Sequence, residues 1–128
     1  MTHLIIIRGR PATKKNSQRM IQVRGRMIPI PSKAYKAWET DALKQVTGIH
    51  RILIETPVNV SVSVWMWRDG MADLVGYIQA ALDMLVKAEV LKDDCAWNPR
   101  IAVSYDGSRI MGVDKKDPRV EIEITYCV

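Results

Sequence analysis

The clearest structural signal in the chain is the segment Pro57-Val-Asn-Val-Ser-Val-Ser-Val-Trp-Met-Trp67. Every second residue from Val58 to Met66 is apolar, and Asn59, Ser61 and Ser63 stand between them. A period of two is typical of a β-strand with one face in the core. The segment therefore predicts a strand whose valines point inward, and the other elements are placed around it.

Helical spacing follows this strand, from about Met71 to Lys87. The apolar stripe of the predicted helix consists of Leu74, Ile78, Ala81, Leu82 and Leu85. On a helical wheel the opposite, polar face holds Asp73, Gly76, Ala80, Asp83 and Lys87. We therefore expect an amphipathic helix that packs on the sheet through one side only.

The remaining elements follow from turn residues and periodicity. Short strands are predicted at 4–7, 20–23, 26–30, 101–105 and 118–126, with the last burying Val120, Ile122 and Ile124. Gly25 supplies a residue that tolerates positive φ between the second and third strands. A helix capped by Ser32 and closed by Gly48 has Tyr35, Trp38, Ala42 and Val46 on its buried face. The order β-ββ-α-β-α-β-β predicts a single α+β domain over residues 1–128, with two helices on one small mixed sheet.

Composition excludes several classes of protein. The chain has 128 residues, 48% hydrophobic and 26% charged, which is ordinary for a globular domain and excludes a disordered tail. No apolar run reaches the roughly 18 residues of a membrane span, and the N-terminus lacks the pattern of a signal peptide. We therefore expect a cytoplasmic protein with no membrane partner. Cys95 and Cys127 form no Cys-x-x-Cys pair, so a disulfide scaffold or a classical zinc site is not expected.

Positive charge is concentrated in the first part of the chain. Residues 1–50 hold ten Lys or Arg and two acidic residues, whereas residues 51–128 hold nine and twelve. The segment from Arg8 to Lys36 has nine basic residues and no acid. Such density is typical of a surface that binds phosphate groups, and a solvated, solubilising face explains it equally well. The predicted nucleic-acid contacts are Arg10, Lys14, Lys15, Arg19, Arg24 and Arg26.

Carboxylates stand at both ends of the second predicted helix. Asp73 is near its start, and Asp93-Asp94 follow its end after a short connection. If the chain turns back there, Asp94 approaches Asp73, and two or three carboxylates could bind Mg²⁺. The alternatives are that Asp69 or Asp73 only caps the helix and that Asp93-Asp94 form a solvated turn. Trp65, Trp67 and Trp97 are expected in the core or at its rim rather than as platforms on which bases stack.

Four segments of the chain carry a further signal when they are taken together and in order. They are Gly9-Arg-Pro-Ala-Thr-Lys-Lys-Asn-Ser17, Pro31-Ser32 with Tyr35 and Trp38, the stretch from Asp73-Leu74 through Ala80-Ala-Leu-Asp83 to Asp93-Asp94, and Pro118-Arg-Val-Glu-Ile-Glu-Ile124. In this order they resemble the RusA family of Holliday-junction resolvases, which is common in phages and prophages. The first segment resembles the family's N-terminal Pro-x-x-Lys-Lys-Asn segment, the second its first helix, the third its signature and the fourth its closing strand.

The resemblance implies a homodimeric, Mg²⁺-dependent crossover junction endodeoxyribonuclease that acts on four-way DNA in recombination and repair. It implies catalytic roles for Asp73 and Asp94, with Asp93 as a possible further metal ligand. A lysine of the Lys14-Lys15 pair is then expected to stabilise the phosphate as a point charge.

The chain departs from the family pattern at three positions. Val75 replaces the family's second helix-start carboxylate, Gly76 replaces an asparagine, and Gln79 replaces a lysine. Valine cannot bind a metal, and on the helical wheel Val75 lies at the edge of the apolar stripe, about 70° from its centre, where partial exposure is expected. One alternative is therefore a resolvase-fold protein that binds DNA with reduced or lost cleavage. A second is a basic nucleic-acid-binding or assembly module that never had a nuclease site.

Overall fold

The computed structural model describes residues 2–13, 19–30, 33–69, 73–92 and 103–126. Its centre is a mixed sheet of β1 (Thr2–Arg8), β4 (Val58–Met66), β5 (Val103–Ser104), β6 (Arg109–Val113) and β7 (Arg119–Tyr126). The order is β1-β7-β4-β5, and β6 pairs with β4 on the same side as β5. β7 runs antiparallel to both of its neighbours, whereas β5 and β6 run parallel to β4.

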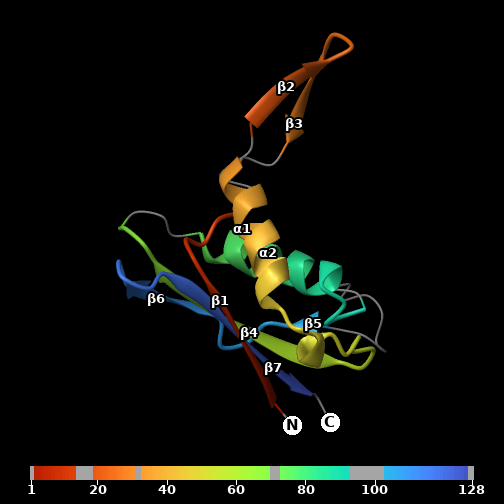
Figure 1. Cartoon of the computed structure of the whole chain (residues 1–128), viewed down its shortest axis with the longest axis vertical. Coiled ribbons are helices and arrows are strands. Elements are labelled where there is room, and N and C mark those ends of the chain that lie inside the picture. The colour runs from red at the N-terminus through yellow and green to blue at the C-terminus, as the bar shows by residue number, and fades with distance from the viewer. Residues whose placement is uncertain (1, 14–18, 31–32, 70–72, 93–102, 127–128) are drawn as a thin grey trace.

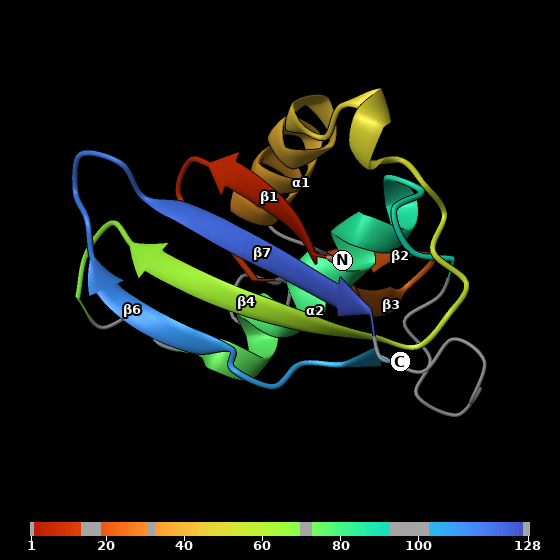
Figure 2. The ribbon, with the colours of Figure 1, turned by 90° about the horizontal axis from the view of Figure 1, so that it is seen from below.

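The helices α1 (Lys33–Gln45) and α2 (Leu74–Lys87) lie on one face of this sheet (Figure 1 and Figure 2). A short 3₁₀ helix, η1 (Gly48–His50), follows α1. The predicted class, a single α+β domain with two helices on a mixed sheet, is therefore confirmed. Within the described ranges no helix has the length and apolar character needed to cross a membrane.

The predicted central strand is confirmed as β4. Val58, Val60, Val62, Val64 and Met66 are all buried, and the residues between them are half-buried. In the register with β7, Val60 pairs with Ile124, Val62 with Ile122 and Val64 with Val120, so that both strands bury the same face. These two rows of valine and isoleucine side chains form the surface on which the helices pack.

The second helix departs from its prediction. It begins at Leu74, after Asp73 as its N-cap, rather than near Met71. The expected polar face is wrong for Gly76 and Ala80, which are buried. At Gly76 the lack of a side chain lets Thr13 pack closely, since a Cβ there would lie 3.1 Å from Thr13 Cγ2. Farther along this face the ammonium Nζ of Lys87 lies 2.8 Å from Glu39 Oε1 of α1, and this ion pair ties the two helices together.

Smaller differences concern α1 and the sheet edge beyond β4. Helix α1 ends at Gln45, and Gly48 opens η1 instead of closing the helix. Of the predicted strand 101–105, the described part forms a strand only at β5, Val103–Ser104. Strand β6 was not predicted from the sequence. Most of β6 is exposed and it lacks a two-residue apolar alternation, because it is an edge strand paired on one side only.

The strands predicted around Gly25 form a hairpin of their own, β2 (Arg19–Val23) with β3 (Arg26–Ile30). The hairpin projects beyond the start of α1, away from the main sheet (Figure 1). Arg24 has φ of 51° and Gly25 of 79°, as a two-residue hairpin turn of type I′ requires. The turn therefore places one arginine in a left-handed conformation that asparagine or glycine adopts more easily.

Candidate nucleic-acid interface and carboxylate site

Asp73 caps the N-terminus of α2. Its Oδ1 accepts a hydrogen bond of 3.3 Å from the backbone N–H of Gly76, and its own carbonyl accepts one from Tyr77. The structure thus confirms that Asp73 caps the helix, and a further role as a metal ligand stays a prediction. Burial, and after it the negative charge of Asp73, raises the pKa of Tyr77. The Asp73 carboxylate therefore lies at the N-terminus of the helix, next to Tyr77, whose hydroxyl stays protonated.

Gly76 allows two side chains distant in sequence to meet at this helix end. A Cβ on Gly76 would lie 2.9 Å from Asp73 Oδ2 and 3.1 Å from Thr13 Cγ2. Thr13 is itself buried, so it packs over the first turn of α2 beside the Asp73 carboxylate. Lys14 and Lys15 follow Thr13 directly but lie outside the described residues. The basic pair therefore follows in sequence from a residue packed close to Asp73.

Val75 faces solvent in the same turn, with 57% of its surface exposed. The wheel predicts Val75 at the edge of the apolar stripe, partly exposed, and this is confirmed. Gln79, one turn later, is also exposed. Val75 and Gln79, two of the three positions that differ from the pattern of the resolvase family, are thus exposed to solvent.

The second predicted carboxylate pair, Asp93 and Asp94, lies outside the described residues. The described chain reaches Lys92 beyond the C-terminal end of α2, where the N–H of Val90 donates to Leu85 and that of Lys92 to Ile54. In the parts of the chain that the structure describes, no three acidic, histidine or cysteine side chains gather closely enough to bind a metal ion. Convergence of Asp73 with Asp94 stays a prediction.

Two arginines flank one tryptophan where β4 ends. The guanidinium carbon of Arg10 lies 4.3 Å from the ring centroid of Trp67, and that of Arg68 lies 4.4 Å from it. Both arginines are exposed and Trp67 is half-buried, as expected for a rim residue. Arg10 was a predicted contact, but Arg68 and Trp67 were not. The sequence signal for them is the Trp67-Arg68 pair directly after the strand.

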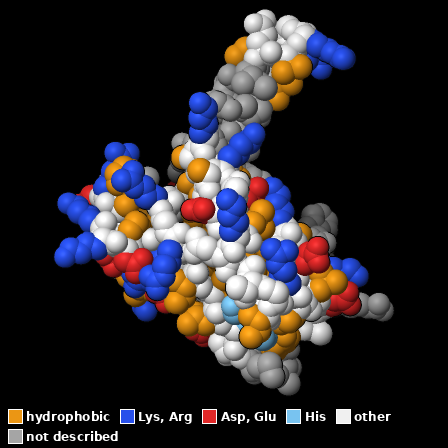
Figure 3. All heavy atoms as spheres, in the orientation of Figure 1, with side chains coloured by type: hydrophobic (Ala, Val, Ile, Leu, Met, Phe, Trp, Pro, Cys, Tyr) orange, Lys and Arg blue, Asp and Glu red, His pale blue; other side chains and the backbone are white. Residues whose placement is uncertain are grey.

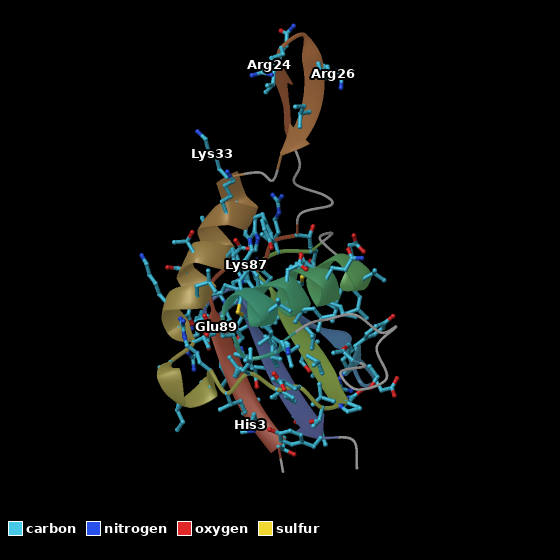
Figure 4. All side chains as sticks on the ribbon, turned by 90° about the vertical axis from the view of Figure 1, so that its right-hand side faces the viewer. His3, Arg24, Arg26, Lys33, Lys87 and Glu89 are labelled. Atoms are coloured by element: carbon cyan, nitrogen blue, oxygen red, sulfur yellow. The ribbon has the colours of Figure 1, made fainter. Side chains whose placement is uncertain are left out.

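The other predicted basic contacts lie on the hairpin and its surroundings. Arg24 and Arg26 are at the hairpin tip, and Lys33 is at the start of α1 (Figure 4). Arg19 belongs to β2, and its side chain is not among those described. Figure 3 shows Lys and Arg side chains at the hairpin tip, near the base of the hairpin and along the left side of the body. Arg8, in contrast, is paired with Asp117 and adds little to this positive surface.

Comparison with known proteins adds no relative. No protein-family model matches the chain, and no curated protein sequence matches it. The resemblance to the resolvase family therefore rests on the residues of the four segments that match its pattern.

Proposed function

We propose that the protein is a Mg²⁺-dependent, structure-selective endonuclease that resolves four-way DNA junctions, acting as a homodimer in the cytoplasm during recombination or repair. One observation supports this most directly. Thr13, the residue before the Lys14-Lys15 pair, packs with Asp73 over the first turn of α2. A carboxylate and a segment leading to two cations are thereby brought together from opposite halves of the chain.

Each residue has a defined role in this proposal. Asp73 would hold the ion together with Asp94 and, as a further ligand, Asp93, while Lys14 or Lys15 would balance charge that develops on the phosphate. Bound Mg²⁺ would lower the pKa of a coordinated water and polarise the phosphate oxygens. Arg10, Arg19, Arg24 and Arg26 would contact the DNA backbone, which positions the strand without reading its sequence. A two-fold dimer would present two such sites to a junction with matching symmetry.

The second candidate function is a resolvase-fold protein that binds junctions without cutting them. Val75 favours it, because an exposed valine stands where the family has a carboxylate. A basic module with no ancestral nuclease site is the third candidate. It fits the exposed arginines equally well but assigns no role to the packing of Thr13 on Asp73.

The decisive test is nicking of a synthetic four-way junction with and without Mg²⁺, comparing the wild-type protein with Asp73→Asn. Asparagine keeps the N-cap but removes the charge, so the variant should fold while nicking falls by at least about 100-fold. Asp41→Asn, a change at an exposed position on α1, is the matched control and should cut normally.

Junction binding without nicking by the wild-type protein would contradict the nuclease and favour the second candidate. Binding to DNA of every shape with equal affinity would favour the third.

A further inference from the structure

The ring of Trp67, just beyond the end of β4, has two cationic neighbours. Arg10 reaches it from the segment after β1, and Arg68 is adjacent to it in sequence. A guanidinium over an indole is favourable, since the ring face carries negative potential. Two guanidinium groups on one ring also repel each other, and within the described chain neither has a carboxylate partner. Among the described residues the group therefore carries positive charge at an exposed position without a carboxylate to balance it.

An anion with two acceptor oxygens and an apolar neighbour matches this group. Guanidinium groups bind phosphate oxygens through paired N–H donors, and the flat indole offers a surface for a base or a sugar. A free carboxylate would satisfy the charges but would leave the exposed part of the ring without a partner. A phosphodiester in a nucleic-acid strand supplies both parts of the ligand.

We propose that Arg10, Trp67 and Arg68 form a phosphate clamp, in which the two guanidinium groups hold one backbone phosphate of a nucleic-acid strand and the indole packs against the adjoining nucleoside. The clamp rests on the proposed function. It adds a contact with the DNA substrate through Trp67 and Arg68, which are not part of the signature of the resolvase family.

The position of the clamp relative to Asp73 follows from chain length. Arg10 precedes Thr13 by three residues, which span at most about 11 Å when fully extended. Thr13 contacts the first turn of α2 beside Asp73. A strand held by the clamp therefore passes close to the Asp73 carboxylate, and the clamp fixes the position of the strand at the candidate site.

The test measures binding of a labelled four-way junction and a labelled single strand by fluorescence anisotropy at several salt concentrations. For the double variant Arg10→Ala/Arg68→Ala we expect at least tenfold weaker binding at low salt. The slope of log K against log salt should become less steep by about 0.7 to 0.9, the value for one phosphate. Lys44→Ala/Arg109→Ala removes the same charge from two exposed positions and should leave the slope unchanged.

The aromatic part of the clamp is tested separately. Trp67→Phe keeps a ring and should retain most of the affinity, whereas Trp67→Leu should lose it without unfolding, as checked by circular dichroism. The indole N–H signal of Trp67, identified by its absence in Trp67→Phe, should shift when a short oligonucleotide is added.

The outcomes separate the clamp from the nuclease. Unchanged affinity and slope in the arginine double variant, with the wild type still nicking junctions, would overturn the clamp and leave the proposed function intact. Loss of binding in the variant, with no nicking by the wild type, would support the clamp and contradict only the nuclease. A wild-type protein that binds no nucleic acid would overturn both.

Discussion

Trp65 and Trp67, two residues apart at the end of β4, both have arginine on the indole but differ in what surrounds the charge. Arg119 lies 3.9 Å from the ring centroid of Trp65, and its Nε and Nη1 donate to Glu121 and Asp114 at 2.8 and 3.0 Å. Its carboxylate neighbours also engage Arg8, through Asp117. Around Trp67, in the described parts of the chain, two arginines have no such partners.

The difference shows that an arginine placed over a tryptophan has two different roles in this protein. Where carboxylates within the fold balance the arginine, the pair joins the start of β7 to the preceding loop and contributes to stability. Where no carboxylate balances it, the charge is available to a ligand from outside. The following variants test this distinction, in order of the expected change in stability.

Removing each tryptophan should separate the two pairs most clearly. Trp65→Ala should lower the free energy of unfolding by about 2 kcal/mol, because its half-buried ring lies within β4 and supports an arginine that is hydrogen-bonded to Glu121 and Asp114. Trp67→Ala should lower it by less than about 1 kcal/mol, because this ring lies at the rim beyond the strand. Urea unfolding measures both values, and equal losses would contradict the distinction.

Arg119→Ala should lower the melting temperature while leaving DNA affinity within about twofold, since the arginine acts inside the fold. Arg10→Ala/Arg68→Ala should do the reverse. Thermal unfolding and anisotropy on the same samples test the pair. A large loss of DNA affinity in Arg119→Ala, at equal folded fraction, would place this arginine in the interface.

The carboxylates around Arg119 also predict a dependence on pH. The backbone N–H of Asp117 and then the Arg119 guanidinium hold the pKa of Asp114 below its ordinary value of 3.8. Its contribution to stability is therefore complete above about pH 4 and is lost as pH falls through the lowered pKa. Asp114→Asn should weaken the acid dependence of the melting temperature, and an unchanged acid limb would show that other carboxylates dominate it.

Gly76→Ala tests the close packing at the candidate site. Alanine normally stabilises a helix interior, but here its Cβ would approach Asp73 and the buried Thr13 at about 3 Å. We expect a net loss of about 1 kcal/mol, together with weaker metal binding if Asp73 is displaced. Gly48→Ala is the control, since its Cβ would meet no atom within 4 Å and should be neutral or slightly stabilising.

Val75→Asp should change stability least, by less than about 0.5 kcal/mol, because the side chain is exposed and a negative charge is favourable in the first turn of a helix. If Asp73 forms the metal site, the added carboxylate should tighten Mg²⁺ binding and raise junction nicking. Calorimetric titration with Mg²⁺ and the nicking assay measure the gain. Unchanged affinity and activity in the folded variant would show that Val75 does not limit the site.

Most of the fold could be predicted because local patterns and burial agree. The alternation from Val58 to Met66 and in β7 allows only one face to be buried, so the sheet follows from the sequence. The edge strand β6 was missed because it has one partner and hence no such pattern. The face of α2 at Gly76 and Ala80 was mispredicted because small residues suit either solvent or a close neighbour, and only the packing of α1 and Thr13 selects between them.

The candidate site divides in the same way. The sequence by itself determined which residues carry charge: the basic N-terminal segment, Asp73 at a helix start, and Val75 at the edge of the apolar stripe. Only the tertiary structure decided which of them meet, because Thr13 reaches Asp73, and Arg10 reaches Trp67, across roughly sixty residues of chain. It also decided that carboxylates balance Arg119 whereas none in the described parts of the chain balances Arg10 or Arg68, since charges interact through space and a sequence records only their order.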